Sequence, residues 1–492
     1  MSSTYGNRRR HWNEECGVVG IAAVEGAAEL ASLALHALQH RGQESAGITV
    51  ADGHRLSTHK KMGLVADVFD EEATRSLTGN YAIGHVRYST SGSSNILNAQ
   101  PLQVASHRGT VSLAHNGNLV NAHLLRRRME LDGSIFATTS DTEVIQHLLA
   151  RHRAEACEDA LLEILPEVKG AYSLVVLTRE KLIAVRDPNG FRPLCLGRYR
   201  DSYVVASESC AFDIIGATYL RDIEPGEMVV MGQGELVSRK LPIEAEEKRC
   251  VFEHVYFSRP DSTVFGRNVE AARRRSGEIL GREAPAVADL VCAVPDSSNT
   301  AALGYARATG LPFELALIRN HYVGRTFISP AQKVRDMSVR IKFNPVAEIL
   351  DGRRVVVVDD SIVRGTTMRK LVKLIRGAGA KEVHLRIASP PVTNPCYYGI
   401  DTPVRNELIA SSHTVDEIAT YLRVDSLAYL SLPGLLEAAG DGGRYCEACF
   451  TGNYPVSFDE GTGKDVFDNH AAGVEIPVKP LPPVAEPEQG DS

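Results

Sequence analysis

The sequence contains no long run of apolar residues. Its 492 residues include short apolar runs such as 355–358, but a membrane-spanning helix needs roughly 20 such residues in succession. The basic cluster at residues 8–11 is followed by Glu14 and Glu15 rather than by an apolar stretch. The sequence therefore argues against a membrane helix and against a secretory signal.

A large excess of one charge is also missing. The net charge is -7, and hydrophobic and charged residues make up 43% and 23% of the chain, which is the composition of an ordinary soluble globular protein. The mild acidity argues against nucleic acid as the main partner. The chain is too long for one compact core, so we expect two domains.

Cysteines are too sparse to form a disulfide framework. The nine cysteines are spread over the whole chain, whereas small disulfide-stabilised proteins place theirs densely. This pattern favours an intracellular protein whose cysteines bind metal or act in catalysis. We therefore expect a cytoplasmic protein.

Residues 16–241 alternate short β-type runs with fewer helical stretches. A helix is predicted over 27–39, and strands are predicted over 17–23, 81–88, 172–177, 181–186 and 202–206. Because strands outnumber helices, an α+β layered fold is expected for this half.

The pattern changes after the charged stretch at 244–249. Strands predicted over 290–294, 353–358 and 382–387 alternate with helices over 299–308 and 367–377. Such alternation is typical of βαβ units and predicts an α/β fold with a parallel sheet. The final segment, from about 470 to 492, is rich in Pro, Glu and Gly and is expected to be a disordered tail.

Cys16 stands immediately before an apolar strand, a setting that by itself fits a buried structural cysteine. Four polar motifs follow it, at 39–47, 84–90, 114–119 and 139–143. Taken together they resemble the glutaminase domain of the class II glutamine amidotransferases, which are N-terminal-nucleophile hydrolases. The resemblance implies αββα layers and makes Cys16 the nucleophile.

The resemblance also implies how Cys16 is activated. Its thiol attacks an amide carbonyl with its own free α-amine, of pKa about 8, as the base. This requires removal of residues 1–15 as a propeptide. The side chain of Asn116 and the backbone N–H of Gly117 would form the oxyanion hole, although an isolated Asn-Gly pair also fits an ordinary turn.

Two charged residues match the glutamine-binding positions of the family. Arg87 would grip the α-carboxylate bidentately, and Asp141 would pair with the α-ammonium; taken singly, each also fits a solvated surface charge. Three residues are expected to shape the pocket or its lid: Arg41, Tyr88 and Thr90. His40 and His85 receive no role, because each also fits a histidine satisfied in the core.

Residues 353–367 describe a buried strand that ends in Asp359 and Asp360, followed by a small-residue loop that opens a helix. The acids alone fit a turn or a helix cap. The whole run resembles the phosphoribosyl pyrophosphate signature of type I phosphoribosyltransferases. This implies that the loop and helix N-terminus hold the 5'-phosphate through Ser361, Arg364, Gly365, Thr366 and Thr367.

The same resemblance assigns the metal and the lid. Asp359 and Asp360 would contact the ribose hydroxyls and, with Ser297, one Mg²⁺ per subunit, a hard cation that prefers oxygen ligands. Arg325 and Lys333 belong to a basic segment, 319–342, that would close over the substrate. Considered alone, the stretch around Ser297 fits a turn with a helix cap, and the segment 319–342 fits a solvated basic loop.

Four further cysteines form a possible set. From spacing alone, Cys446 and Cys449 fit a zinc half-site or a redox pair, and Cys250 and Cys396 fit structural cysteines. All four match the ligands of one [4Fe–4S] cluster per subunit in the iron-sulfur subgroup of amidophosphoribosyltransferases. The cluster would be structural rather than catalytic.

The order of these elements resembles the amidophosphoribosyltransferase family over residues 16–454. This implies synthesis of 5-phosphoribosylamine, glutamate and pyrophosphate from glutamine, phosphoribosyl pyrophosphate and water, the first step of purine synthesis. It further implies an internal ammonia route, a homotetramer and inhibition by purine nucleotides. The expected divisions are a propeptide at 1–15, a glutaminase domain at 16–245, a phosphoribosyltransferase domain with a cluster-binding segment at 246–465, and a tail at 466–492.

Two alternatives remain. Another class II amidotransferase is opposed by residues 359–367, because those relatives carry sugar-isomerase or adenylating domains instead. A non-catalytic regulator that senses phosphoribosyl pyrophosphate is opposed by the intact glutaminase motifs.

Overall fold

The computed structural model describes residues 16–458 apart from 89–94, 233, 322–340 and 441–442. Four sequence predictions lie outside the described residues: the propeptide at 1–15, Thr90, the lid residues Arg325 and Lys333, and the tail at 466–492. Among the helices described, none has the length and apolar character needed to cross a bilayer.

The amino-terminal half is built on two antiparallel sheets. The first has the order β11-β9-β10-β1-β4-β2-β3 and the second the order β13-β12-β8-β7-β6-β5. The strands of the first are β1 Gly17–Ile21, β2 Ser45–Ala51, β3 Leu56–Met62, β4 Tyr81–Arg87, β9 Cys195–Tyr199, β10 Ser202–Ala206 and β11 Thr218–Asp222. Those of the second are β5 Leu102–Ser106, β6 Gly109–Leu119, β7 Gly170–Leu177, β8 Leu182–Arg186, β12 Glu227–Gly232 and β13 Glu235–Lys240.

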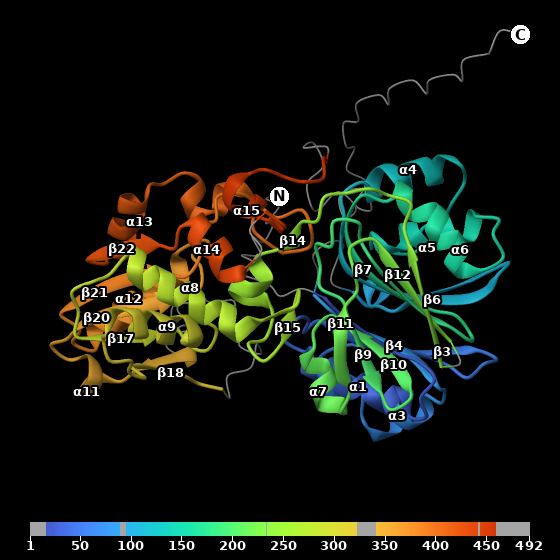
Figure 1. Ribbon diagram of the computed structural model, residues 1–492, viewed down its shortest axis with the longest axis horizontal. Helices are drawn as coiled ribbons and strands as arrows, with labels where there is room; N and C mark the ends of the chain where they lie inside the picture. Colours follow the sequence, from blue (N-terminus) through green and yellow to red (C-terminus); the bar gives the residue numbers. More distant parts are fainter. Residues whose placement is uncertain (1–15, 89–94, 233, 322–340, 441–442, 459–492) are drawn as a thin grey trace, which may run out of the picture.

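Alternating side chains pack these sheets face to face. Val18 of β1 joins a core with Val175 and Ala184 of the second sheet, whereas the next residue, Val19, packs with the helices on the outer face. The helices are α1 Ala27–Ala37, α2 Val65–Val68, α3 Glu71–Ser76 and α7 Cys210–Ile215 beside the first sheet, and α4 Ala122–Leu131, α5 Thr142–Arg151 and α6 Cys157–Ile164 beside the second (Figure 1). The expected αββα layering is confirmed.

The carboxyl-terminal half contains a parallel sheet of order β17-β20-β21-β22. Its strands are β17 Leu290–Ala293, β20 Arg354–Asp359, β21 Glu382–Ile387 and β22 Ser426–Tyr429. Both faces are covered: Val356 and Val358 pack with the helices of one face, and Val355 and Val357 with those of the other. The expected α/β fold with a parallel sheet is confirmed.

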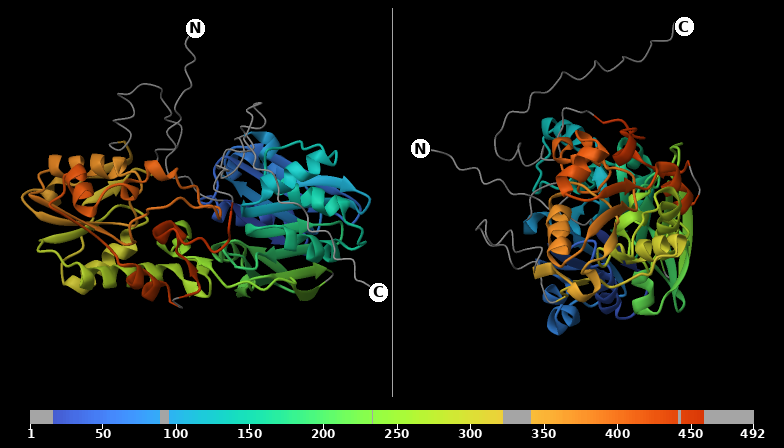
Figure 2. Two further views of the ribbon diagram at one scale, coloured as in Figure 1. Left: turned by 90° about the horizontal axis from the view of Figure 1, so that it is seen from above. Right: turned by 90° about the vertical axis from the view of Figure 1, so that its left-hand side faces the viewer.

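The helices of this half follow the predicted alternation. They are α8 Val269–Glu283, α9 Asn299–Thr309, α11 Ala347–Leu350, α12 Thr366–Gly377, α13 Val415–Leu422, α14 Leu432–Ala439 and α15 Ala448–Thr451. Two short strands, β18 Leu317–Arg319 and β19 Phe343–Pro345, form a hairpin. Figure 2 shows this half beside the amino-terminal half in the long molecule.

Short elements join the two halves. β14 Arg249–Cys250 pairs in parallel with β23 Tyr445–Cys446, near the end of the described chain. A π-helix, η3 Glu253–Phe257, follows β14, and a hairpin of β15 Thr263–Val264 and β16 Arg267–Asn268 precedes α8. The charged stretch at 244–249, after which the sequence pattern changes, therefore leads directly into structure that pairs with the carboxyl-terminal segment.

Candidate active sites and the family of the chain

Cys16 lies at the amino end of β1, next to the carboxyl end of β4. The register pairs Gly17 with Val86, which puts Cys16 beside Arg87. The Cys16 thiol donates to the carbonyl of Tyr88 at 3.5 Å. Burial raises the pKa of Cys16 to about 11, and the Arg87 charge opposes that shift. A base is therefore needed to form the thiolate at neutral pH.

Asn116 and Gly117 lie inside strand β6, so the alternative of an Asn-Gly turn is wrong. Asn116 Nδ2 donates to Ser207 Oγ at 3.4 Å, and Ser207 Oγ also accepts from the Val18 N–H at 3.0 Å. Gly117 has φ 152°, and a Cβ there would lie 2.1 Å from the Ala171 carbonyl oxygen. Only glycine fits this backbone position.

Asp141 is buried at the start of α5, not on the surface. One carboxylate oxygen accepts from the Leu119 N–H at 2.9 Å, and the other lies 3.8 Å from His115 Nδ1. Burial opposes ionisation, but His115 and backbone donors lower the pKa of Asp141 overall. Both Asp141 and Arg87 act electrostatically on Cys16, so the structure brings the three predicted residues into one site.

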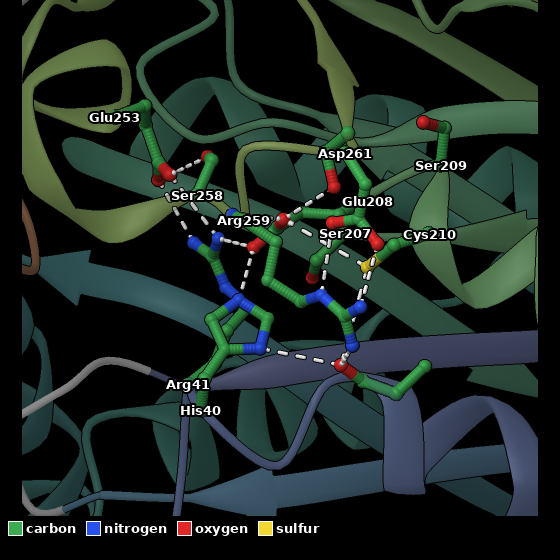
Figure 3. A network of polar contacts seen from close by, with 12 residues as sticks. His40, Arg41, Ser207, Glu208, Ser209, Cys210, Glu253, Ser258, Arg259 and Asp261 are labelled. Carbon is green, nitrogen blue, oxygen red and sulfur yellow. Dashed lines mark hydrogen bonds and ion pairs between the residues drawn. The ribbon is translucent and has the colours of Figure 1, made fainter. Parts of the chain in front are cut away.

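Arg41 is part of a buried ion network that the sequence did not reveal (Figure 3). Its Nε donates to the Cys16 carbonyl at 3.2 Å, and its Nη2 donates to Glu253 at 2.8 Å. Its Nη1 also donates to Glu208, whose carboxylate lies 2.7 Å from His40 Nε2. Arg41 thus holds the backbone of Cys16 through the Cys16 carbonyl. Of the two expected roles, this fits shaping the pocket rather than forming a lid, because the Arg41 side chain is fully buried.

His85 behaves as a core residue. It is fully buried, and its Nε2 lies 3.0 Å from the His115 carbonyl oxygen. Burial lowers the pKa of His85 to about 3, so the ring is neutral at physiological pH. Glu44, within 4.0 Å of Arg87, is a further charged group at this site that sequence reasoning missed.

The second cluster of polar groups lies where β17 and β20 end side by side. Ala293 pairs with Val358, so the residues that follow meet at one edge of the sheet. Ser297 Oγ donates to Asp360 at 2.5 Å, and Ser361 Oγ donates to the other oxygen of Asp360 at 2.7 Å. Ser298, which sequence reasoning passed over, donates to Asp359 at 2.9 Å.

This edge of the sheet has the chemistry of a cation and phosphate site. Burial raises the pKa of Asp359, and the adjacent charge of Asp360 raises it further. A divalent cation would relieve that repulsion, and the hydroxyl and carboxylate oxygens suit Mg²⁺. Gly365, with φ 70°, turns the chain into α12, whose first residues Thr366 and Thr367 offer free N–H groups to an anion.

Arg364 faces a carboxylate in this state. Its guanidinium donates to Glu407 at 2.5 Å, and the pair is partly exposed. An arginine in such a pair must exchange its partner to reach a phosphate. Arg364 therefore fits the predicted substrate-binding role less directly than Gly365, Thr366 and Thr367.

The four predicted cluster cysteines line a single pocket. Cys250, Cys396, Cys446 and Cys449 share it with Phe252, Tyr398, Ile400, Thr402, Ala448 and Tyr454. All four thiols are free. Among the described residues, no group of three or more His, Cys, Asp or Glu side chains is arranged so that it could hold a metal ion. The pocket nevertheless gathers four soft ligands from three distant segments, which fits a cluster better than a lone CxxC pair.

Comparisons with known proteins match both halves of the chain. A glutamine amidotransferase domain family matches residues 85–213, and a phosphoribosyl transferase domain family matches residues 271–389. The chain is 50% identical to the Bacillus subtilis amidophosphoribosyltransferase, over 92% of this chain and 96% of that one. It is 52% identical to the Archaeoglobus fulgidus amidophosphoribosyltransferase, over 90% and 98% of the two chains.

Solved structures give the same result. A structure described as the allosteric regulatory enzyme of purine biosynthesis matches with a TM-score of 0.88 and 49% identity, over 92% of this chain and 98% of that one. The B. subtilis glutamine phosphoribosylpyrophosphate amidotransferase, complexed with ADP and GMP, matches with a TM-score of 0.88 and 48% identity, over 92% and 100%. The chain therefore belongs to the amidophosphoribosyltransferase family, the enzymes of the first step of purine biosynthesis.

Proposed function

We propose that this chain releases ammonia from glutamine at Cys16 and uses it at Asp359 and Asp360 to convert phosphoribosyl pyrophosphate into 5-phosphoribosylamine. The observation that carries the proposal is the presence, in one chain, of two separate groups of buried polar residues. Arg87 and Asp141 lie at Cys16, and the hydroxyls of Ser297 and Ser298 meet the two acids at the sheet edge.

At the first site, Arg87 and Asp141 would bind the α-carboxylate and α-ammonium of glutamine. The Cys16 thiolate attacks the amide carbon, ammonia leaves, and water then cleaves the thioester to give glutamate. The Asn116 side chain and the Gly117 N–H stabilise the oxyanion of each step. The base is the α-amine of Cys16, so the active form begins at Cys16 after residues 1–15 have been removed.

At the second site, ammonia attacks the ribose C1 and pyrophosphate leaves. The N–H groups and hydroxyls of Ser361, Gly365, Thr366 and Thr367 would hold the 5'-phosphate, with Arg364, Arg325 and Lys333 as further contacts. Asp359 and Asp360 would hold the ribose hydroxyls and, with Ser297, one Mg²⁺. Bound Mg²⁺ supplies positive charge that offsets the charge developing on the leaving group.

The pocket of Cys250, Cys396, Cys446 and Cys449 would hold one [4Fe–4S] cluster with a structural role. Four thiols and a lining of mostly apolar and aromatic side chains support this assignment, because clusters in proteins are held by four thiolates in sites largely shielded from water. The cluster would tie the segment around Cys446 and Cys449 to β14.

The broader organisation is proposed from the family. The glutaminase domain spans 16–245 and the phosphoribosyltransferase domain 246–465, with the cluster-binding segment at its end and a tail at 466–492. The subunits form a cytoplasmic homotetramer with an internal ammonia route. Purine nucleotides inhibit it, which is supported by the related B. subtilis structure complexed with ADP and GMP.

Pyrophosphate release tests the proposal. Protein that begins at Cys16 should release pyrophosphate when glutamine, phosphoribosyl pyrophosphate and Mg²⁺ are all present, and omission of either substrate should abolish it. Protein that keeps residues 1–15 should release pyrophosphate with ammonium salts but not with glutamine. Failure of the mature protein with both nitrogen donors would contradict the proposed reaction.

A further inference from the structure

The loop that carries Cys396 lies directly against the strand that carries the oxyanion-hole residues. A Cβ placed on Gly399 would lie 3.2 Å from Gly117 Cα and 3.3 Å from its carbonyl carbon. Gly399 has φ 113°, a conformation that favours glycine. The two backbones therefore approach as closely as they do because both residues are glycine.

Further contacts anchor this loop to the amino-terminal half. Asn118 Nδ2, one residue beyond Gly117, donates to the Tyr397 carbonyl at 2.9 Å. The Tyr398 ring stacks on Phe191 with 4.3 Å between ring centroids. Tyr398 and Phe191 share a small core with Ala171, the residue whose carbonyl leaves no room for a Cβ on Gly117.

Gly117 thus packs against two backbones. Ala171 of β7 contacts it, and so does the loop at 396–399. An oxyanion hole works only when its donors point at the place where the charge develops, and a misplacement of about 1 Å can cost about 10²-fold in rate. The loop at 396–399 contacts the Cα and the carbonyl carbon of Gly117, the residue that carries the proposed N–H donor, so a shift of the loop would move that residue.

We propose that the loop at 396–399 positions the oxyanion hole, so that the segment carrying Cys396 controls the chemical step of glutamine cleavage but not glutamine binding. The proposal rests on the proposed role of Asn116 and Gly117. Tyr397 and Gly399 are positioning residues, because neither touches the reacting amide. Arg87 and Asp141, which would bind glutamine, lie on other elements, at the end of β4 and at the start of α5. Asp141 meets this strand at the Leu119 N–H, two residues beyond Gly117.

Gly399→Ala is the direct test, because the added methyl group must push Gly117 by a few tenths of an ångström. In the mature, cluster-loaded protein we expect the kcat for glutamine hydrolysis to fall by about ten- to a hundredfold. The KM for glutamine and the synthesis from ammonium salts should remain close to those of the parent. The iron content should also be unchanged.

Gly443→Ala is the matched control. Gly443 precedes strand β23, which carries another of the four pocket cysteines, Cys446. It has φ 109°, and no described atom lies within 4 Å of the Cβ that alanine would add. It therefore carries the backbone cost of alanine at positive φ without contacting the oxyanion strand, and its glutamine hydrolysis should match that of the parent. An equal loss in both variants would overturn the proposal.

A binding measurement separates positioning from a general structural role. A glutamine analogue with an aldehyde in place of the amide forms a hemithioacetal with Cys16, whose oxygen occupies the oxyanion hole. Gly399→Ala should weaken binding of this analogue about as much as it lowers kcat, while the affinity for glutamate stays unchanged. Parallel loss of both affinities, or of iron, would overturn the proposal.

Two further variants keep the result interpretable. Asn118→Ala removes only the hydrogen bond to Tyr397 and should lower kcat in the same direction by a smaller factor, which covers the case in which Gly399→Ala does not fold. Asn116→Gly removes a proposed oxyanion donor itself. If Asn116→Gly has no effect, the proposed function of these residues fails. If it lowers kcat while Gly399→Ala and Asn118→Ala do not, only the positioning role fails.

Discussion

The guanidinium of Arg41 donates at 2.8 Å to Glu253, a residue 212 positions later in the chain. Both side chains are fully buried. Arg41 also donates to the Cys16 carbonyl, and Glu253 also accepts from Arg192 and from Ser258. The two residues therefore link the nucleophile to the π-helix that begins three residues after Cys250.

Removal of the Glu253 charge should destabilise the protein strongly. Glu253→Gln leaves Arg41 and Arg192 buried with less compensating charge, and breaking a buried pair typically costs about 3–5 kcal/mol. Denaturant unfolding at neutral pH measures this loss. Glu71→Gln is the matched control, because its partner Arg75 and Glu71 itself are largely exposed, and its stability should change by less than about 1 kcal/mol.

The effect of Glu253→Gln should also depend on pH. Burial raises the pKa of Glu253, but Arg192 and Arg41 outweigh it and hold the pKa at about 2, below the ordinary value of 4.5. A carboxylate whose pKa is lower in the folded than in the unfolded protein stabilises the folded state fully at pH values above the ordinary pKa of 4.5. This stabilisation is lost as the pH falls from there toward the pKa of about 2 in the folded protein. The stability difference between parent and variant should therefore narrow as pH falls below about 4.5. A constant difference would contradict the proposed ion network.

Cys16→Ala should abolish glutamine use and leave synthesis from ammonium salts intact, because only the nucleophile is lost. Steady-state pyrophosphate release with each nitrogen donor measures both activities. Cys157→Ala is the control, because Cys157 is a buried cysteine of helix α6 remote from the site. Loss of both activities in Cys16→Ala would contradict separate sites.

Asp359→Asn should remove synthesis with either nitrogen donor and spare the hydrolysis of glutamine to glutamate. The proposed role of this carboxylate is to bind Mg²⁺ and ribose at the phosphoribosyl site, which is separate from the proposed site at Cys16. Asp289→Asn is the control. Asp289 lies just before β17 and pairs with Arg354, at the opposite end of β20 from Asp359, so this variant should retain full activity. Chelation of Mg²⁺ should reproduce the Asp359→Asn result in the parent protein.

Anaerobically purified protein should contain iron and sulfide near four of each per chain, as a [4Fe–4S] cluster requires. Cys446→Ala should lower both, because it removes one of the four thiols of the pocket. Cys157→Ala should retain both. Zinc as the only metal in the parent protein would overturn the cluster assignment.

Regular elements were predictable where the apolar pattern was continuous. The strand expected at 382–387 is β21 Glu382–Ile387 without change, and the helix expected at 299–308 is α9 Asn299–Thr309. Strand β22, Ser426–Tyr429, was missed because all four of its residues are only half-buried. The apolar run at this strand extends only from Leu427 to Leu430, and a run of four residues does not distinguish a strand from a helix.

The long-range contacts around Cys16 were not predictable from one sequence. Glu208 and Glu253 are isolated acids in the sequence, and nothing local indicates that each lies against Arg41. Likewise, nothing in the sequence around Gly399 indicates that this residue packs against Gly117 in the folded chain. Local motifs predicted the candidate active residues, whereas the groups that contact them are brought there only by tertiary packing.

The transfer of glutamine nitrogen to the product tests the central claim most directly. Mature protein is given phosphoribosyl pyrophosphate, Mg²⁺ and glutamine labelled with nitrogen-15 in the amide, in a solution that also contains unlabelled ammonium. The proposed link between Cys16 and the Asp359–Asp360 site predicts that 5-phosphoribosylamine carries the label at far above the proportion of labelled ammonia in solution. Product labelled only in that proportion, or absence of product, would contradict it.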